Sequence, residues 1–95
     1  DIEKHDYSDI IREVVFRMSV LFEAAGLNHP QMELDENVIG ECDRFRVEQV
    51  IGNLLTNAIR YGMGKPVFIT LTKVNDVARF TVSDQGYGIA QEDLG

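Results

Sequence analysis

The sequence is poor in cysteine and lacks long apolar runs. Cys42 is its single cysteine, so the chain cannot form an internal disulfide. No cluster of Cys and His has the spacing of a zinc site. No segment is long and apolar enough to span a bilayer or to act as a signal peptide. A reducing, cytoplasmic environment without direct membrane contact is therefore expected.

Positive charge is also scarce. Nine Lys and Arg stand against sixteen Asp and Glu, which gives a net charge of −7. This balance argues against binding nucleic acid through a broad phosphate-contacting surface. A bound polyphosphate would need a metal ion and a few local cations. With 95 residues, 44% of them apolar and 26% charged, the chain is expected to form one small globular domain over 1–95.

The most informative stretch runs from Arg46 to Tyr61. Its apolar residues recur at helical spacing and predict a helix with one buried side, formed by Val47, Val50, Ile51, Leu54, Leu55, Ala58 and Ile59. Asn53, Asn57, Arg60 and Tyr61 then gather along one edge. Two carboxamides, a cation and an aromatic ring would suit a polyanion that carries a flat base. The alternative is an amphipathic helix with a solvated polar side.

An earlier helix is predicted from the same periodicity. Asp6 or Ser8 is placed to cap it, and it is expected to run to about Ala25. Gly26 stands where a C-terminal cap belongs, and Pro30 discourages continuation. The expected role of this helix is to cover one side of a sheet.

Extended pieces are predicted between and after the helices. Alternation suggests short strands near 32–34 and 38–39, with Asp43 capping the central helix and Gly62 and Gly64 ending it.

A longer hairpin is expected after the central helix. A strand over 67–72, a reversal at 74–76 and a return strand over 77–83 should pair antiparallel. Gln91, Glu92 and Asp93 are expected to begin another helix.

The return strand leads into Asp84-Gln85-Gly86-Tyr87-Gly88-Ile89. A carboxylate at the end of a strand can accept a hydrogen bond from an exocyclic amine, and so read an adenine. Glycines let a ligand approach the main chain closely. The alternative is an ordinary turn.

Together these motifs resemble the ATP-binding catalytic domain of sensor histidine kinases, over Tyr7 to Gly95. The superfamily also includes gyrase, the ninety-kilodalton heat-shock chaperone and MutL. Its N box, Asn-x-x-x-Asn-Ala followed by a basic and an aromatic residue, is matched by Asn53, Asn57, Ala58, Arg60 and Tyr61. Its first glycine box is matched by Asp84, Gly86, Gly88 and Ile89. The segment over 43–50 also resembles the one that leads into the N box in these kinases. The resemblance implies a Bergerat-type α/β two-layer sandwich, a mixed, mostly antiparallel sheet covered by helices on one face.

The resemblance implies catalytic roles for the two asparagines of the N box. Asn57 would ligate Mg²⁺, which bridges the phosphates of ATP, and Asn53 would support the metal or its water. The relatives that hydrolyse ATP carry Glu in place of Asn53, and an amide is no general base. Arg60 would contact phosphate, and Tyr61 would pack near the base or ribose, with a place in the core as its alternative. Lys65 is either a further phosphate contact or a solvated surface lysine.

The first glycine box would hold the base. Asp84 would accept a hydrogen bond from the adenine amino group, Gly86 and Gly88 would give access, and Ile89 would line the pocket or join the core.

Departures from the family pattern matter as well. The second glycine box, the lid and the phosphoacceptor histidine are missing, and the surroundings of His5 do not match that histidine. The chain thus resembles the C-terminally truncated front part of a catalytic domain, expected to be inactive alone.

The resemblance implies that the full-length parent protein would transfer the ATP γ-phosphoryl group to a histidine of an upstream dimerisation domain, and then to a response regulator. Weak stability, or pairing with a second copy, is expected of the truncated piece.

Three alternatives to a histidine kinase remain. One is a hydrolysing ATPase, which Asn53 disfavours. Another is a serine-kinase regulator of the same superfamily. The last is a non-catalytic nucleotide-binding or dimerisation module.

Overall fold

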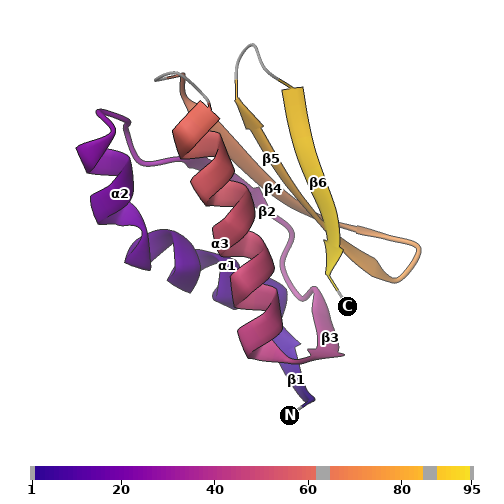
Figure 1. The fold of residues 1–95 in the computed structure, drawn as a ribbon. Coiled ribbons are helices and arrows are strands. Elements are labelled where there is room, and N and C mark those ends of the chain that lie inside the picture. The colour runs from indigo at the N-terminus through magenta and orange to yellow at the C-terminus, as the bar shows by residue number, and fades with distance from the viewer. Residues whose placement is uncertain (1, 62–64, 85–87, 95) are drawn as a thin grey trace.

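In the part of the chain that the structure describes, nine helices and strands follow one another (Figure 1). The structure, a computed structural model, describes residues 2–61, 65–84 and 88–94, without the side chains of residues 84, 88 and 89. The elements are β1 (Glu3–Asp6), α1 (Tyr7–Arg17), α2 (Ser19–Ala24), β2 (Gln31–Leu34), β3 (Ile39–Cys42), α3 (Arg44–Tyr61), β4 (Val67–Val74), β5 (Val77–Asp84) and β6 (Gly88–Leu94).

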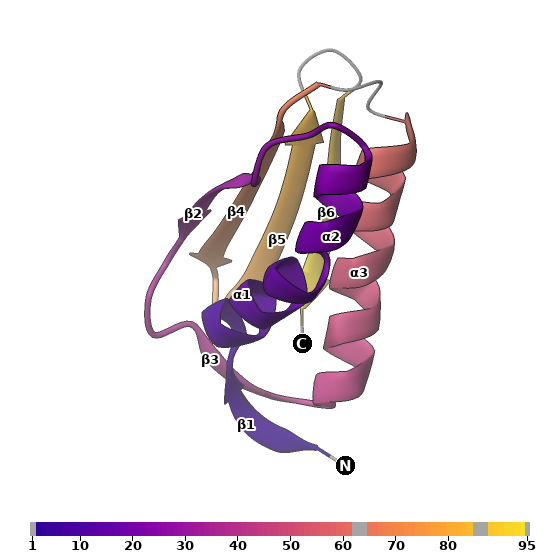
Figure 2. The same cartoon turned by 90° about the vertical axis from the view of Figure 1, so that its left-hand side faces the viewer.

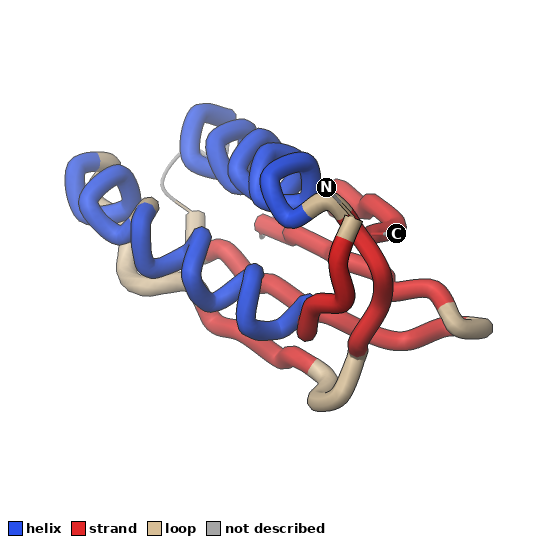
Figure 3. The backbone as a smooth tube through the Cα atoms, turned by 90° about the horizontal axis from the view of Figure 1, so that it is seen from below, coloured by secondary structure: helices blue, strands red, loops and turns tan. Residues whose placement is uncertain are grey.

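The main sheet has the strand order β2-β4-β5-β6, and β1 pairs with β3 in a separate ribbon. β2 runs parallel to β4, whereas β4–β5, β5–β6 and β1–β3 are antiparallel. The helices cover one face of the main sheet (Figures 2 and 3). The predicted two-layer α/β architecture with a mixed, mostly antiparallel sheet is confirmed.

The first helical segment differs from the prediction of one continuous helix. The Asp6 carboxylate caps it by accepting hydrogen bonds from the backbone amide of Ser8 at 3.0 Å and from its hydroxyl at 2.8 Å. The helix is interrupted at Met18, whose backbone departs from helical geometry (φ −91°, ψ 3°), so α1 and α2 are separate. Gly26, at φ +74°, follows α2 in the left-handed conformation that glycine adopts without steric cost.

The central helix α3 begins as the sequence predicts. The Asp43 carboxylate accepts a hydrogen bond from the amide of Phe45 at 3.1 Å, which satisfies one of the free donors of the first turn. The helix ends at Tyr61. Gly62 and Gly64, which were predicted to end it, lie outside the described residues.

The hairpin of β4 and β5 also follows the prediction. Asn75 and Asp76 connect the strands with positive φ angles of 50° and 65°, the combination that matches the twist of a two-residue hairpin. Alternate side chains of both strands are buried against the helices: Val67, Ile69, Leu71, Ala78, Phe80 and Val82.

Two strands depart from the sequence prediction. Residues 3–6, for which the sequence predicts no strand, form β1 because their backbone groups pair with those of β3. The helix expected at Gln91–Asp93 is wrong, since these residues lie in β6 and pair with β5 over seven register positions. The backbone bonds of β5, the burial of Leu94, and the pairing of Asp93 with Arg79 at 3.1 Å together outweigh the local helix preference.

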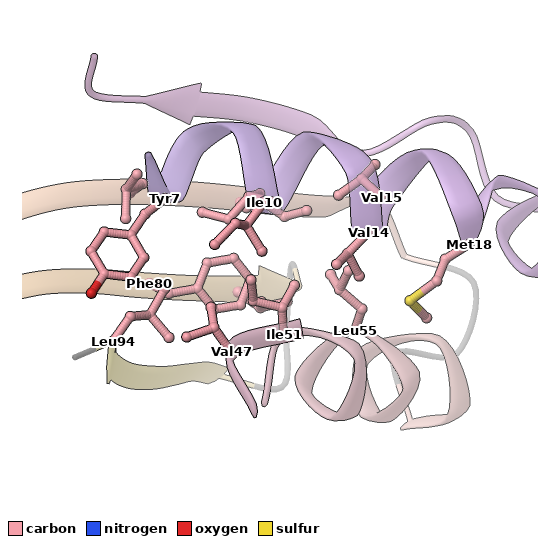
Figure 4. Close-up of a cluster of buried hydrophobic side chains, with 14 of the residues drawn as sticks. Tyr7, Ile10, Val14, Val15, Met18, Val47, Ile51, Leu55, Phe80 and Leu94 are labelled. Atoms are coloured by element: carbon pink, nitrogen blue, oxygen red, sulfur yellow. The ribbon is translucent and has the colours of Figure 1, made fainter. Parts of the chain in front are cut away.

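The core lies between the helices and the sheet (Figure 4). Its fully buried side chains come from both layers and include Ile10, Ile11, Phe22, Ile51, Leu55, Ile69, Leu71 and Phe80. In Figure 4, Val14 of α1 and Met18, the residue that follows α1, point toward α3, so the two helices share this core.

An ion-pair network ties α1 to α3 on the outside of the helix layer. Arg44 pairs with Glu13 and, through Nε, with Glu48 Oε2 at 2.8 Å. Arg17 Nη2 contacts the other oxygen of Glu48 at 3.0 Å. The hydrogen bond from Arg17, followed by that from Arg44, lowers the pKa of Glu48 from its ordinary value, against the opposing effect of burial.

Replacing Glu48 with Gln should therefore reduce stability in a pH-dependent way. The folded-state pKa of Glu48 lies below its ordinary value of 4.5, so its stabilisation is complete above that value. It is lost as pH falls through the folded-state pKa. Urea unfolding should show the variant less stable by about 1 kcal/mol near neutral pH, with the difference shrinking in acid. Glu23→Gln on α2 is the control. A difference that stays constant into strong acid would contradict this role.

Gly40 in β3 marks a close approach between two elements. A Cβ atom built on Gly40 would lie 2.8 Å from Tyr7 Oη and 2.9 Å from Tyr7 Cε2. Tyr7 is itself buried in the core cluster, so its ring cannot move into solvent to relieve the clash. Gly40→Ala should therefore lower the free energy of unfolding by about 1–3 kcal/mol, as measured by urea denaturation.

Gly52→Ala is the matched control with the opposite sign. A Cβ atom at Gly52 in α3 meets nothing within 4 Å. Alanine is the better helix former, so this variant should be more stable by about 0.5–1 kcal/mol. Equal effects of the two substitutions would contradict the packing described for Gly40.

Candidate functional site

Helix α3 presents the polar residues of the first motif on its exposed side. Val47, Ile51, Leu55 and Ala58 are buried on the opposite side. Asn53 and Asn57, one helical turn apart, are both exposed, as are Arg60 and Tyr61 in the last turn. Tyr61 is 62% exposed, so the alternative that placed it in the core is wrong.

The end of α3 favours a cation near Asn57. The last carbonyl groups of a helix carry about half a negative charge, so this end attracts cations and disfavours anions. Arg60 lies in the last turn, where it opposes that negative potential and can meet an anionic ligand. Its guanidinium carbon is 5.9 Å from the centroid of the Tyr61 ring, a cation–π distance.

The second motif begins where β5 ends. Asp84 is the last residue of β5, opposite Val67 of β4 and Gly88 of β6 in the strand registers. Figure 1 shows that β5 ends, and β6 begins, at the same end of the molecule as the last turn of α3. The fold therefore brings the backbone of Asp84 and Gly88 to the end where Asn57 and Arg60 lie. Gly86 lies outside the described residues, and Ile89 follows Gly88 in β6.

The chemistry of these side chains fits a Mg²⁺ ion that arrives with a nucleotide. Mg²⁺ prefers oxygen ligands and commonly binds through one or two protein groups together with phosphates and waters. The exposed amide oxygens of Asn53 and Asn57 can serve in that way. Within residues 2–61, 65–84 and 88–94, no cluster of three or more His, Cys, Asp or Glu could hold a metal by itself.

A separate cavity of about 340 Å³ lies at the other end of α3. Residues of α3, including Arg46, Val47 and Val50, form one wall, and Glu92, Asp93 and Leu94 of β6 form another. Among the residues that the structure describes, none from the two motifs lines it. This cavity could not be predicted from the sequence, because one of its walls forms only when the residues of β6 adopt a strand.

Cys42 lines that cavity and is buried. Burial raises the pKa of its thiol, and it also raises the pKa of the neighbouring Tyr7 hydroxyl. The thiol is thus protonated at neutral pH and unsuited to act as a nucleophile.

The helices in the described part of the chain include none with the length and apolar character needed to cross a membrane.

Comparisons with known proteins identify relatives over most of the chain. Residues 42–95 match the family model of histidine kinase-, DNA gyrase B- and HSP90-like ATPases. The sensor histidine kinase MtrB of Mycolicibacterium paratuberculosis is 36% identical over 89 residues, which cover 93% of this chain and 16% of MtrB. The histidine kinase AdeS of Acinetobacter baumannii has a similar structure, with a TM-score of 0.79 and 30% identity over 95% of this chain and 45% of AdeS.

A third relative is a kinase captured with its partner. The histidine kinase ThkA, in complex with the response regulator protein TrrA, gives a TM-score of 0.76 at 25% identity. The match covers 85% of this chain and 25% of ThkA. The chain thus spans about a sixth of the curated relative and a quarter to a half of the two structures. With its family match extending over more than half of its residues, the chain belongs to the histidine kinase-, DNA gyrase B- and HSP90-like ATPases.

Proposed function

We propose that residues 1–95 are the front part of the ATP-binding domain of a sensor histidine kinase. Its parent transfers the γ-phosphoryl group of ATP to a histidine in a dimerisation domain outside this chain. The observation that carries the proposal is the common location of two motifs. The exposed Asn53–Asn57–Arg60 edge of α3 and the Asp84 end of β5 lie at one end of the molecule.

The phosphate side of the site is assigned to α3. Asn57 holds Mg²⁺ through its amide oxygen, and Asn53, one turn earlier, supports the metal or its water. When bound, Mg²⁺ neutralises the charge on the phosphate oxygens during transfer. Arg60 contacts a phosphate oxygen and offsets the negative end of the helix. Tyr61, exposed beside Arg60, packs against the base or ribose.

The base side of the site is assigned to the second motif. In this proposal the Asp84 carboxylate would accept a hydrogen bond from the adenine amino group, Gly86 and Gly88 would let the ligand approach the backbone, and Ile89 would line the pocket. A carboxylate discriminates in favour of a base with a donor at this position, because a base without one would leave the charge unpaired.

The amide side chain of Asn53 favours phosphoryl transfer to a protein over hydrolysis of ATP. A carboxamide cannot take a proton from water, so α3 supplies no general base at this position. Transfer to a protein acceptor needs mainly positioning and charge neutralisation, which Asn53, Asn57 and Arg60 provide. The response regulator bound to ThkA supports a partner of the same kind for the parent of this chain.

A calorimetric titration with a non-hydrolysable ATP analogue tests the proposal. Binding should be stronger with Mg²⁺ than without it. Asp84→Asn should weaken binding at least about tenfold, which corresponds to the loss of a charged hydrogen bond. Asp76→Asn, the same change in the exposed turn at the other end of β5, is the matched control. Circular dichroism checks that each variant is folded. A folded wild-type chain that binds no analogue, or an Asp84→Asn variant that binds normally, would contradict the assignment.

A further inference from the structure

Strand β6 forms one edge of the main sheet (Figure 1). It pairs with β5 through seven consecutive register positions, and no other described strand pairs with it. One side of its backbone therefore presents donors and acceptors that no described residue satisfies. β6 contains no Pro or Lys, the residues that commonly keep a further strand away from such an edge.

Glu92 breaks the apolar pattern on the helix-facing side of β6. It lies opposite Phe80, whose ring is fully buried between the sheet and the helices. Residues directly opposite each other share a face of the sheet, so Glu92 lies on the core face. Its neighbours on that face, Ala90 and Leu94, are apolar. A carboxylate between them, where the period of the strand calls for an apolar residue, has no explanation within the described fold.

Glu92 also lines the cavity of about 340 Å³ between β6 and α3. Val47 and Val50 of α3 give this cavity an apolar wall, and the buried Leu94 continues that wall along β6. The volume falls in the range of ligand pockets, about 300–1,000 Å³. A fitting occupant must bring apolar atoms to the wall and a partner for the carboxylate.

The charges around the cavity favour a cation. Among its described lining residues, three are acidic, Asp43, Glu92 and Asp93, and Arg46 is the one basic residue. Asp43 caps α3, and Asp93 pairs with Arg79. Glu92 forms no ion pair with any described residue. A Lys or Arg side chain, with a charged head on a long aliphatic stem, would meet both the carboxylate and the apolar wall.

We propose that β6 accepts an extended segment of a partner protein as a further strand of the main sheet. The segment pairs with the free backbone edge of β6 and carries a Lys or Arg opposite Glu92. This cation enters the cavity because directly opposite residues share a face. The residues two positions before and after it lie on the same face and are apolar, beside Ala90 and Leu94. In strand addition of this kind, main-chain hydrogen bonds give affinity and alternate side chains give specificity.

A second copy of this chain does not fit the site. Two copies with a net charge of −7 repel each other, and both would bring Glu92 and Asp93 to the contact. The described strands with a free edge other than β6 are β1, β2 and β3, and none carries a Lys or Arg with apolar residues two positions away on both sides. The cavity lies at the opposite end of α3 from Asn57 and Arg60, so the proposal does not rest on nucleotide binding.

Fluorescence polarisation with a labelled peptide tests the proposal. The peptide Thr-Val-Thr-Lys-Thr-Val-Thr carries the proposed pattern on residues that favour strands. It should bind the folded chain saturably, with a Kd below about 1 mM. The same peptide with Glu in place of Lys should bind at least about tenfold more weakly. A folded chain that binds neither peptide, or binds both equally, would overturn the proposal.

Reversing the charge of Glu92 separates this contact from general attraction to an acidic chain. Glu92→Lys should weaken binding of the Lys peptide at least about tenfold and strengthen binding of the Glu peptide. Glu36→Lys, the same change at an exposed position between β2 and β3, should alter both affinities by no more than about twofold. Both positions are exposed, so both variants should fold, which circular dichroism checks. Unchanged affinities in Glu92→Lys would contradict the proposed contact.

Two N-methylated peptides test the strand pairing itself. One carries methyl groups on the amides of its Val and Lys residues, and the other carries them on the amides of its Thr residues. Successive N–H groups of a strand point to opposite edges, so only one of these sets faces β6. One peptide should therefore keep its affinity, and the other should lose at least about tenfold. Equal affinities would show that the lysine binds without an added strand, and would overturn the proposal.

Discussion

Replacing Asn57 with alanine is expected to abolish the advantage that Mg²⁺ gives to nucleotide binding. The exposed amide oxygen of Asn57 is the proposed protein ligand of the metal, at the negative end of α3. Without it, the affinity for an ATP analogue in Mg²⁺ should fall at least about tenfold, toward the value measured in a chelator. Calorimetric titrations with and without Mg²⁺ give both affinities for each variant.

Two further variants make this result specific. Gln49→Ala removes another exposed amide from the same helix, about two turns before Asn57, and should keep the full effect of Mg²⁺. Asn57→Asp keeps an oxygen ligand and should retain part of the effect. An Asn57→Ala variant whose affinity still responds fully to Mg²⁺ would show that the metal is held elsewhere.

Replacing Phe80 with alanine is expected to have the largest effect on stability. Its ring is fully buried in β5 between the sheet and the helices. Removing such a side chain costs about 3–5 kcal/mol, through lost burial and the cavity left behind. A domain of 95 residues has a total stability of about 5–14 kcal/mol, so much of the population should unfold in mild urea.

The matched control is another phenylalanine. Phe16 on α1 is 76% exposed, and Phe16→Ala should change the free energy of unfolding by no more than about 0.5 kcal/mol. Urea denaturation followed by circular dichroism compares the two variants directly. Similar losses for Phe16 and Phe80 would contradict the burial described for β5.

Elements with a strong apolar period could be predicted from the sequence. Helix α3 carries its apolar residues at helical spacing and its cap at Asp43, and both are present in the structure. The β4–β5 hairpin follows the alternation around the turn at Asn75 and Asp76. In these segments local preference and tertiary packing agree.

Elements that depend on a distant partner could not be predicted. β1 consists of polar residues, and its support comes from β3, where Lys4 lies opposite Glu41. β6 contains residues that favour the start of a helix, but Asp93 lies opposite Arg79 once β5 is in place. Such pairs become visible only when the strand register is known.

One part of the candidate site could likewise be predicted from the sequence, and the other part could not. Helical spacing alone places Asn53 and Asn57 on one exposed edge, as the structure has them. The meeting of that edge with the end of β5 depends on how α3 packs on the sheet, which no local pattern specifies. The roles of the residues in both motifs, from Asn53, Asn57, Arg60 and Tyr61 to Asp84, Gly86, Gly88 and Ile89, stay predictions.

The parallel pairing of β2 with β4 has a consequence for how quickly the chain folds. Gln31 lies opposite Phe68, and Glu3 opposite Cys42, so both pairings join positions about 40 residues apart. The β4–β5 hairpin closes through two residues and can form on its own within microseconds. We therefore expect α3 and this hairpin to associate early, with β2 and β1 added only after the long loops close. Substitutions in β2 should then accelerate unfolding and leave the folding rate nearly unchanged, whereas substitutions at the contact of α3 with β5 should slow folding.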